Sequence, residues 1–211
     1  MFALCSLRSA RYRRAVEPFR LILADPPWKF SDDLPGKTRG AAKNYDVMTV
    51  AEICSYALPP IADDAMLLLW RLSSMPAEAL AVVRAWGFEP KSEIVWVKLS
   101  SEKEDSTIAV GMGRFVRGSH ETCIVATRGK AQRLIRDRGV KSVLLAPRRG
   151  HSEKPREFYR VAERLFPGPR VELFARGAPI DGWTQYGREA WGRPDGPPAP
   201  GPEEGKACAL R

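Results

Sequence analysis

Apolar residues occur along the chain in short runs separated by polar or proline-containing stretches. The runs Phe19–Ala24 (FRLILA), Ala65–Arg71 (AMLLLWR) and Glu93–Lys98 (EIVWVK) predict three buried strands. Three further runs predict strands over Glu121–Thr127, Lys141–Ala146 and Arg170–Ala175. Continuous apolar runs of this kind are typical of strands that are covered on both faces of a sheet.

Three segments between these strands have the features of helices. The first opens with a capping box formed by Thr49 and Glu52, and the second has proline in its first turn and Gly87 just past its end. The third carries an apolar face at helical spacing. The expected helices span residues 49–58, 76–86 and 155–165.

The alternation of strands and helices predicts an α/β domain with a mostly parallel sheet and helices on both of its faces. We expect this domain to span residues 19–190, preceded by a basic arm (1–18). The Pro- and Gly-rich segment 191–211 is typical of a disordered tail. The polar loops 29–48 and 99–119 are long enough to be binding loops.

The charge balance favours a polyanionic partner. The chain has 34 Lys and Arg against 25 Asp and Glu, a formal net charge of +9, and Lys and Arg bind nucleic acid by neutralising phosphates. Residues 112–150 carry ten of these cations, opposed only by Glu121 and Asp137. This concentration favours a nucleic-acid face over scattered solubilising charge.

Cysteine and histidine are too sparse for a metal centre. The four cysteines lie far apart without a C-x-x-C pair, and there are two histidines, so we expect neither a zinc site nor a disulfide framework. No apolar run is long enough to span a bilayer, and the N-terminus lacks the apolar core of a signal peptide. We therefore expect a cytoplasmic protein with free thiols and no membrane partner.

The candidate chemistry lies in Asp25-Pro26-Pro27-Trp28, directly after the first strand. Ligands of open α/β sheets bind beyond the carboxyl ends of strands. An ionised Asp25 and the carbonyl of Pro26 are two acceptors for the hydrogens of an amine, and the prolines fix the backbone direction. Trp28 offers a flat ring for stacking a base. These residue types suit methylation of an adenine N6 amine. The alternative interpretation of the tetrapeptide is a strand-ending turn with a core tryptophan.

The tetrapeptide resembles the signature of the N6-adenine methyltransferases with an Asp-Pro-Pro-Trp motif. That family includes the catalytic subunit of the eukaryotic messenger-RNA N6-adenine writer and small bacterial and phage DNA methyltransferases. The resemblance runs from about Leu21 to Glu189 and includes further segments in the family's order. These segments are 45–49, 95–98, 118–125, 152–157, 167–176 and 183–189.

The resemblance implies a Rossmann-like S-adenosylmethionine-dependent methyltransferase fold with the catalytic motif early and the cofactor strand late. Asp25, Pro26, Pro27 and Trp28 would be catalytic. The residues implied to bind S-adenosyl-L-methionine are Asp25, Lys154, Glu172, Leu173, Phe174, Arg176, Arg188 and Glu189. The expected substrate-binding residues are Tyr45, Arg117, His120, Glu121, Arg148 and Arg149. Arg188 departs from the family, which has Asn there for the cofactor ribose.

Four functions stay open at the level of sequence. The small size and the lack of accessory domains favour adenine methylation in DNA, with the same reaction on RNA as the alternative. A catalytically silent nucleic-acid-binding partner is disfavoured by the intact tetrapeptide. A small-molecule or protein-amide methyltransferase is disfavoured by the +9 charge. A homodimer and a heteromeric partner are both compatible with the sequence.

Overall fold

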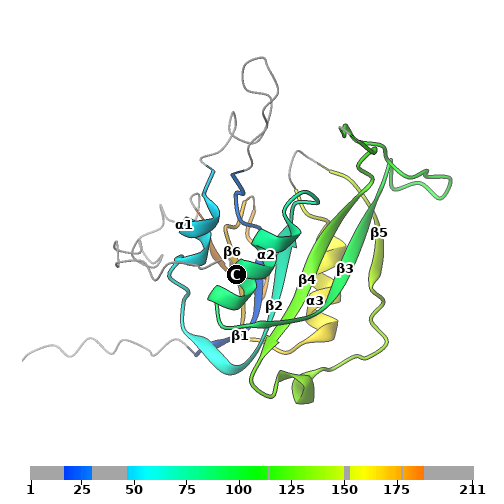
Figure 1. The fold of residues 1–211 in the computed structure, drawn as a ribbon. Coiled ribbons are helices and arrows are strands. Elements are labelled where there is room, and N and C mark those ends of the chain that lie inside the picture. The colour runs from blue at the N-terminus through cyan, green and yellow to red at the C-terminus, as the bar shows by residue number, and fades with distance from the viewer. Residues whose placement is uncertain (1–16, 30–46, 114, 150–152, 177, 188–211) are drawn as a thin grey trace, which may run out of the picture.

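The computed structural model describes residues 17–29, 47–113, 115–149, 153–176 and 178–187. Almost all of the predicted arm and the whole of the predicted tail lie outside the described residues. The helices are α1 (Val50–Cys54), α2 (Pro76–Ala85) and α3 (Arg156–Leu165), with a 3-10 turn η2 (Ala131–Leu134). The strands are β1 (Phe19–Ala24), β2 (Ile61–Arg71), β3 (Glu89–Leu99), β4 (His120–Arg128), β5 (Val143–Pro147), β6 (Arg170–Leu173) and β7 (Thr184–Tyr186) (Figure 1).

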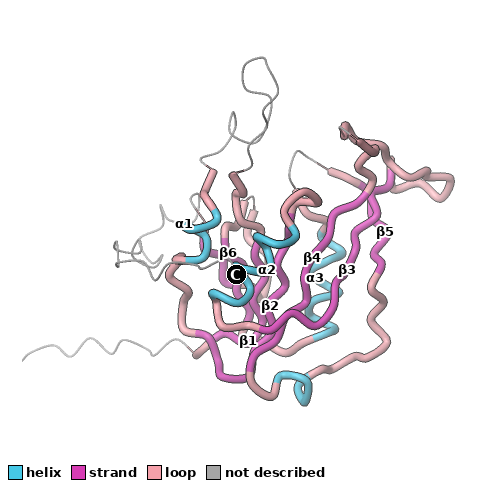
Figure 2. The backbone as a smooth tube through the Cα atoms, in the orientation of Figure 1, coloured by secondary structure: helices cyan, strands magenta, loops and turns pink. Residues whose placement is uncertain are grey.

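The seven strands form one sheet in the order β5-β3-β4-β2-β1-β6-β7. β4 runs antiparallel to both of its neighbours, β2 and β3, whereas the other four pairings are parallel. The sheet is therefore mixed, and the α/β architecture is confirmed. Because six strands run in one direction, their carboxyl ends share the upper edge of the sheet in Figure 2.

The two faces of the sheet carry separate cores, because successive residues of a strand point to opposite faces. Ile22 of β1 packs with residues of α1 and α2, whereas the neighbouring Leu21 and Leu23 pack with Phe158 of α3. The expectation of helices on both faces is confirmed. The central β1 is buried along most of its length, which explains why its bounds agree with the apolar run in the sequence.

Several element bounds differ from those expected. α1 ends at Cys54, with Ser55 as its C-cap, instead of near residue 58. Leu58 precedes a proline, and a residue in that position avoids helical backbone angles. β2 and β3 begin four residues earlier than expected, in polar segments that pair through their backbones near the ends of the sheet. β6 ends at Leu173 because Phe174 has a φ of 61°, outside the strand region. The short β7 and η2 have no apolar run and were not predicted.

Candidate active site

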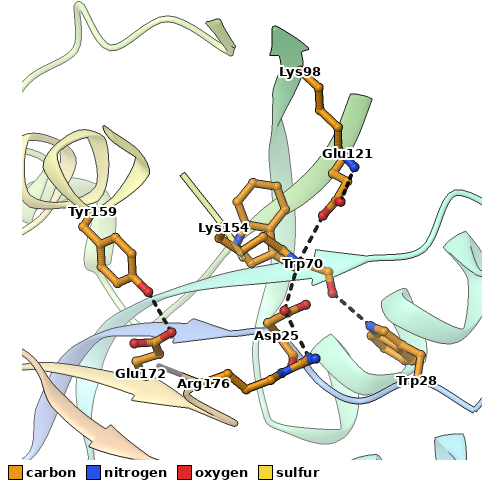
Figure 3. A network of polar contacts seen from close by, with 9 residues as sticks. All are labelled: Asp25, Trp28, Trp70, Lys98, Glu121, Lys154, Tyr159, Glu172 and Arg176. Carbon is orange, nitrogen blue, oxygen red and sulfur yellow. Dashed lines mark hydrogen bonds and ion pairs between the residues drawn. The ribbon is translucent and has the colours of Figure 1, made fainter. Parts of the chain in front are cut away.

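Asp25 lies at the carboxyl end of β1, between the neighbouring strands β2 and β6, with two cations at its carboxylate (Figure 3). Lys154 Nζ lies 2.8 Å from Asp25 Oδ2, and an Arg176 guanidinium nitrogen lies 3.3 Å from the same oxygen. Lys154 precedes α3 and Arg176 follows β6, so two crossovers of the chain return cations to the end of β1. The structure thus brings together Asp25, Lys154 and Arg176, three of the eight residues that were predicted to bind the cofactor.

The charge cluster extends from Lys154 to two residues of the neighbouring strands. Lys154 Nζ also lies 3.1 Å from Glu121 Oε2 at the start of β4. The other oxygen of Glu121 lies 2.6 Å from Lys98 Nζ near the end of β3. The cluster thus alternates in sign from Lys98 through Glu121, Lys154 and Asp25 to Arg176 (Figure 3). Three cations face two anions, which leaves a formal charge of +1.

The ionic partners hold these groups in their charged forms. Burial alone would lower the pKa of Lys154, but the carboxylates of Asp25 and Glu121 outweigh it and raise the pKa. Burial alone would raise the pKa of Glu121, but Lys154 and Lys98 lower it below its ordinary value. Lys154 is therefore a cation, and Glu121 an anion, throughout the neutral pH range.

The acceptors of the tetrapeptide are only partly used. Two backbone carbonyls follow Asp25 along the tetrapeptide. The Pro26 carbonyl accepts from the Trp28 backbone N–H at 2.9 Å, and the Pro27 carbonyl accepts from the Met48 backbone N–H at 2.7 Å. Both cations of Asp25 approach Oδ2, and no hydrogen bond or ion pair joins Oδ1 to another of the described residues. A carbonyl oxygen has two lone pairs. Within the part of the chain that the structure describes, Asp25 Oδ1 and one lone pair of the Pro26 carbonyl are therefore available as acceptors.

Trp28 anchors the turn after β1. Its ring is 4% exposed and packs in the core on the side of α1 and α2, and its Nε1–H donates to the Trp70 carbonyl at 3.1 Å. A buried indole that is hydrogen-bonded to the neighbouring strand holds the Asp-Pro-Pro segment against the end of β2. Most of the ring surface is covered by the protein itself, so stacking of a base on Trp28 stays a prediction.

The four residues predicted to bind the cofactor in and after β6 do not share one environment. Both oxygens of Glu172 accept hydrogen bonds, from Tyr159 Oη at 2.8 Å and from Gln185 Nε2 at 2.7 Å, and burial raises the pKa of this carboxyl. Leu173 is buried on the opposite face of the sheet, with residues of α1 and α2. The centroid of the Phe174 ring lies 4.6 Å from the centroid of the Tyr56 ring. Only Arg176 contacts Asp25. Their binding of a cofactor stays a prediction.

The predicted substrate-binding residues are also only partly assembled. Glu121 belongs to the charge cluster, whereas Arg117, His120 and Arg148 are exposed around the same edge of the sheet. Arg149 is bound within the protein, with a guanidinium nitrogen 3.1 Å from Glu102 and 3.4 Å from Glu157. The remaining predicted residues, Tyr45 for the substrate and Arg188 and Glu189 for the cofactor, lie outside the described residues.

Four residues of this region were not among the site residues predicted from the sequence. Lys98 and Trp70 lie near the carboxyl ends of β3 and β2. The rule that drew attention to Asp25, that ligands bind at the carboxyl ends of strands, therefore identifies them as well. Lys154 Nζ lies 5.4 Å from the centroid of the Trp70 ring. Tyr159 and Gln185 have no such signal, because their role depends on Glu172 in another strand.

We expect the pairing of Glu121 to stabilise the fold in a pH-dependent manner. Because its pKa is lowered from 4.5 on folding, the contribution is present above the unfolded pKa and is lost as pH falls through the folded pKa. Glu121→Gln should lower the free energy of unfolding by about 1–2 kcal/mol at neutral pH. Urea unfolding checks this, and the difference from wild type should shrink by about pH 3. A difference independent of pH would contradict it.

The described residues contain no group of three His, Cys, Asp or Glu side chains placed to hold a metal ion. In the same part of the chain, no helix has both the length and the apolar character needed to cross a bilayer.

The chain is similar to a family of known proteins. The MT-A70 family model matches residues 19–189. The chain is 31% identical to the human N(6)-adenosine-methyltransferase catalytic subunit METTL3, over 81% of this chain and 28% of that protein. It is also 31% identical to the MT-A70-like protein of Drosophila melanogaster, over 81% and 27% of the two chains. It is 27% identical to the type II methyltransferase M.MunI of Mycoplasma sp, over 81% and 77%.

The chain spans about a quarter of the length of the METTL3-like proteins that it matches. The family match nevertheless begins at the start of β1 and includes the Asp-Pro-Pro-Trp segment, Lys154 and Arg176. The resemblance expected from the tetrapeptide and the later segments is thus confirmed over most of the chain, and the chain belongs to the MT-A70 family.

Proposed function

We propose that this chain is an S-adenosylmethionine-dependent methyltransferase that acts on the N6 amine of adenine in a nucleic acid. The observation that carries the proposal is Asp25 at the end of β1, where Lys154 and Arg176 hold Oδ2 and no other described residue is bonded to Oδ1. The family match and the names of the N(6)-adenosine-methyltransferase relatives support it. The mixed sheet with helices on both faces is compatible with a Rossmann-like methyltransferase fold.

The charge cluster fits the amino-acid part of S-adenosylmethionine, which carries one ammonium and one carboxylate. Lys154 and Arg176 are cations for the carboxylate, and Asp25 is an anion for the ammonium. The formal charge of +1 within the cluster favours the carboxylate in particular. When bound, the cofactor supplies an electrophilic methyl group. We propose Glu172, whose carboxylate is held by Tyr159 and Gln185, as a further hydrogen-bond acceptor for the cofactor. Leu173 and Phe174 are the residues that we propose to line the cofactor pocket.

The chain's own residues would then orient the amine. An adenine N6 lone pair is delocalised into the ring, so the amine must be held with that lone pair turned toward the methyl group. Asp25 Oδ1 accepts one amine hydrogen, and the second lone pair of the Pro26 carbonyl accepts the other. Two fixed acceptors supply orientation and preorganised electrostatics. When the amine nitrogen takes the methyl carbon, the bond from that carbon to the cofactor sulfur breaks and its electron pair stays on sulfur. The amine then gives up a proton, for which the Asp25 carboxylate would be the acceptor.

The exposed cations around this edge of the sheet suit a phosphate backbone. Arg117, His120 and Arg148 are the residues that we propose as phosphate contacts, with Arg149 available if it leaves its acidic partners. The net charge of +9 supports a polyanionic substrate. We expect binding to weaken steeply as the salt concentration rises, as it does for phosphate contacts in general.

DNA is the proposed substrate, with RNA as the second candidate. The DNA proposal rests on the resemblance to small bacterial and phage enzymes and on the likeness to the type II methyltransferase M.MunI. The higher identity to the N(6)-adenosine-methyltransferase relatives favours RNA. The intact cluster of Asp25, Lys154 and Arg176 argues against a catalytically silent partner subunit. A cytoplasmic location stays a prediction.

A methyl-transfer assay with labelled S-adenosylmethionine tests the proposal. Matched DNA and RNA oligonucleotides, single- and double-stranded, are incubated with the protein, digested and separated as nucleosides. We expect label in N6-methyladenine, with DNA preferred. Label in N6-methyladenine from RNA alone would support the second candidate. Cofactor binding without any product would point to a missing partner or target sequence, and the absence of cofactor binding would overturn the enzyme proposal.

A further inference from the structure

The outer side of α3 carries only arginine at its exposed positions. Three residues of the helix are exposed, and all three are arginines spaced four residues apart, so they lie along one side of the helix. The opposite side is buried, because Phe158 and Ala162 pack in the core between α3 and the sheet. We call the exposed set the arginine stripe: Arg156, Arg160 and Arg164.

The arginine stripe does not stabilise the helix that carries it. Like charges four residues apart repel one another along a helix, and Arg156 in the first turn also opposes the helix dipole, which favours an anion there. Arg164 is paired with Asp137 after η2. Within the described residues, the side chains of Arg156 and Arg160 form no ion pair or hydrogen bond. A bound polyanion would relieve the repulsion within the stripe.

The acidic residues of α3 are used within the protein. Glu157 is paired with Arg149, whose guanidinium nitrogen lies 3.4 Å from the Glu157 carboxylate. Glu163 accepts a hydrogen bond from Trp183 Nε1 at 2.8 Å. Both acids lie at half-buried positions beside the stripe. The solvent-facing side of α3 is therefore basic.

The arginine stripe begins beside the charge cluster of the active site. Lys154, which lies 2.8 Å from Asp25 Oδ2, is two residues before Arg156 in the chain. From there α3 runs along the face of the sheet opposite α1 and α2, behind the strands in Figure 1. At a rise of about 1.5 Å per residue, the stripe extends about 12 Å from Arg156 to Arg164. It therefore leads away from the active-site edge of the sheet.

Further arginines continue this surface at the far end of α3. The Arg136 backbone N–H donates to the Leu165 carbonyl at 3.0 Å, so the segment after η2 lies against the end of the helix. Residues 130–141 contain five basic residues and a single acid, Asp137. Three arginines of this segment are exposed: Arg133, Arg136 and Arg138. The basic surface thus extends beyond the stripe.

The chemistry of this surface favours phosphates over a protein as its ligand. A guanidinium group can donate two parallel hydrogen bonds to the oxygens of one phosphate. The centre of a protein interface is depleted in charged residues, and none of the strongly exposed large apolar side chains belongs to α3. We propose that the arginine stripe binds phosphates of the substrate nucleic acid on one side of the target base. The inference rests on the proposed function for the nature of the substrate.

Fluorescence anisotropy of the full chain with short labelled oligonucleotides, at several salt concentrations and without cofactor, tests the stripe. The probes are a DNA duplex and single strands of DNA and RNA. Arg156→Gln combined with Arg160→Gln removes two cations, and Arg164 is kept because its loss would also break the pair with Asp137. The slope of log affinity against log salt concentration should fall by about 1.8 for the duplex and about 1.4 for a single strand. Affinity at low salt should fall about 10-fold.

Arg84→Gln combined with Lys91→Gln is the matched control. It also removes two exposed positive charges, one in α2 on the other face of the sheet and one near the start of β3. The control should keep the wild-type slope. The melting temperature of the stripe variant should not fall, because glutamine forms helices about as well as arginine and relieves the repulsion.

A stripe variant with the wild-type slope would overturn the inference and assign the arginines to an acidic protein or to solvent, and so would a wild type that binds no oligonucleotide. Because the assay contains no cofactor, its result does not depend on methyl transfer. A wild type that binds without methylating, with a lower slope in the stripe variant, would support the stripe and contradict the proposed function. Methyl transfer by a wild type whose stripe variant binds equally well would contradict the stripe alone.

Discussion

Asp25→Asn is expected to reduce methyl transfer about 100- to 1,000-fold, the loss seen when one preorganised electrostatic group of an active site is removed. The asparagine keeps the shape and one acceptor oxygen but removes the negative charge. The formal charge of the cluster rises from +1 to +2, with Lys154 and Arg176 directed at a neutral group. The ammonium of the cofactor then loses its anion, and the amine of adenine loses its strongest acceptor.

The loss is measured as the initial rate of label transfer at saturating cofactor, together with the cofactor dissociation constant from calorimetry. Asp63→Asn is the matched control, because Asp63 is an exposed acid at the far end of β2 whose nearest cation, Arg128, is 3.9 Å away. The control should keep wild-type activity. If Asp25→Asn or Asp25→Ala retained more than about a tenth of the activity, Asp25 would not orient the amine.

Lys154→Met is expected to weaken cofactor binding about 10- to 100-fold, because a hydrogen bond to a charged group is worth about 1.5–3 kcal/mol. The side chain is 13% exposed and its ammonium lies between the carboxylates of Asp25 and Glu121. Methionine preserves the unbranched apolar stem over the Trp70 ring while removing the cation. Asp25 keeps Arg176 and Glu121 keeps Lys98, so we expect the fold to persist.

Calorimetric titration with the cofactor and thermal unfolding separate the two effects. Lys91→Met, which removes an exposed cation at the opposite end of β3, is the matched control and should bind the cofactor as the wild type does. Wild-type cofactor affinity in Lys154→Met combined with a lower rate of methyl transfer would place Lys154 at the target base rather than at the cofactor carboxylate.

Prediction from the sequence was most accurate where local patterns decide the structure. β1 agrees with its apolar run because it is central and covered on both faces, so every residue but one is buried. The capping box of Thr49 and Glu52 is present because its atoms lie within one helical turn. The alternation of strands and helices likewise predicted the layers of the fold, since each apolar face must be covered by another element.

The amino-acid sequence by itself determined the family and the tetrapeptide after β1, and the resemblance marked Lys154 and Arg176 as residues for the cofactor. Only the tertiary structure decided that β4 runs antiparallel, since an apolar run has no direction. It also decided that Lys154 and Arg176, 129 and 151 positions from Asp25, meet one oxygen of its carboxylate. The physical reason is that strand order and register place charged groups at one sheet edge, and Coulomb attraction pairs them only after that placement.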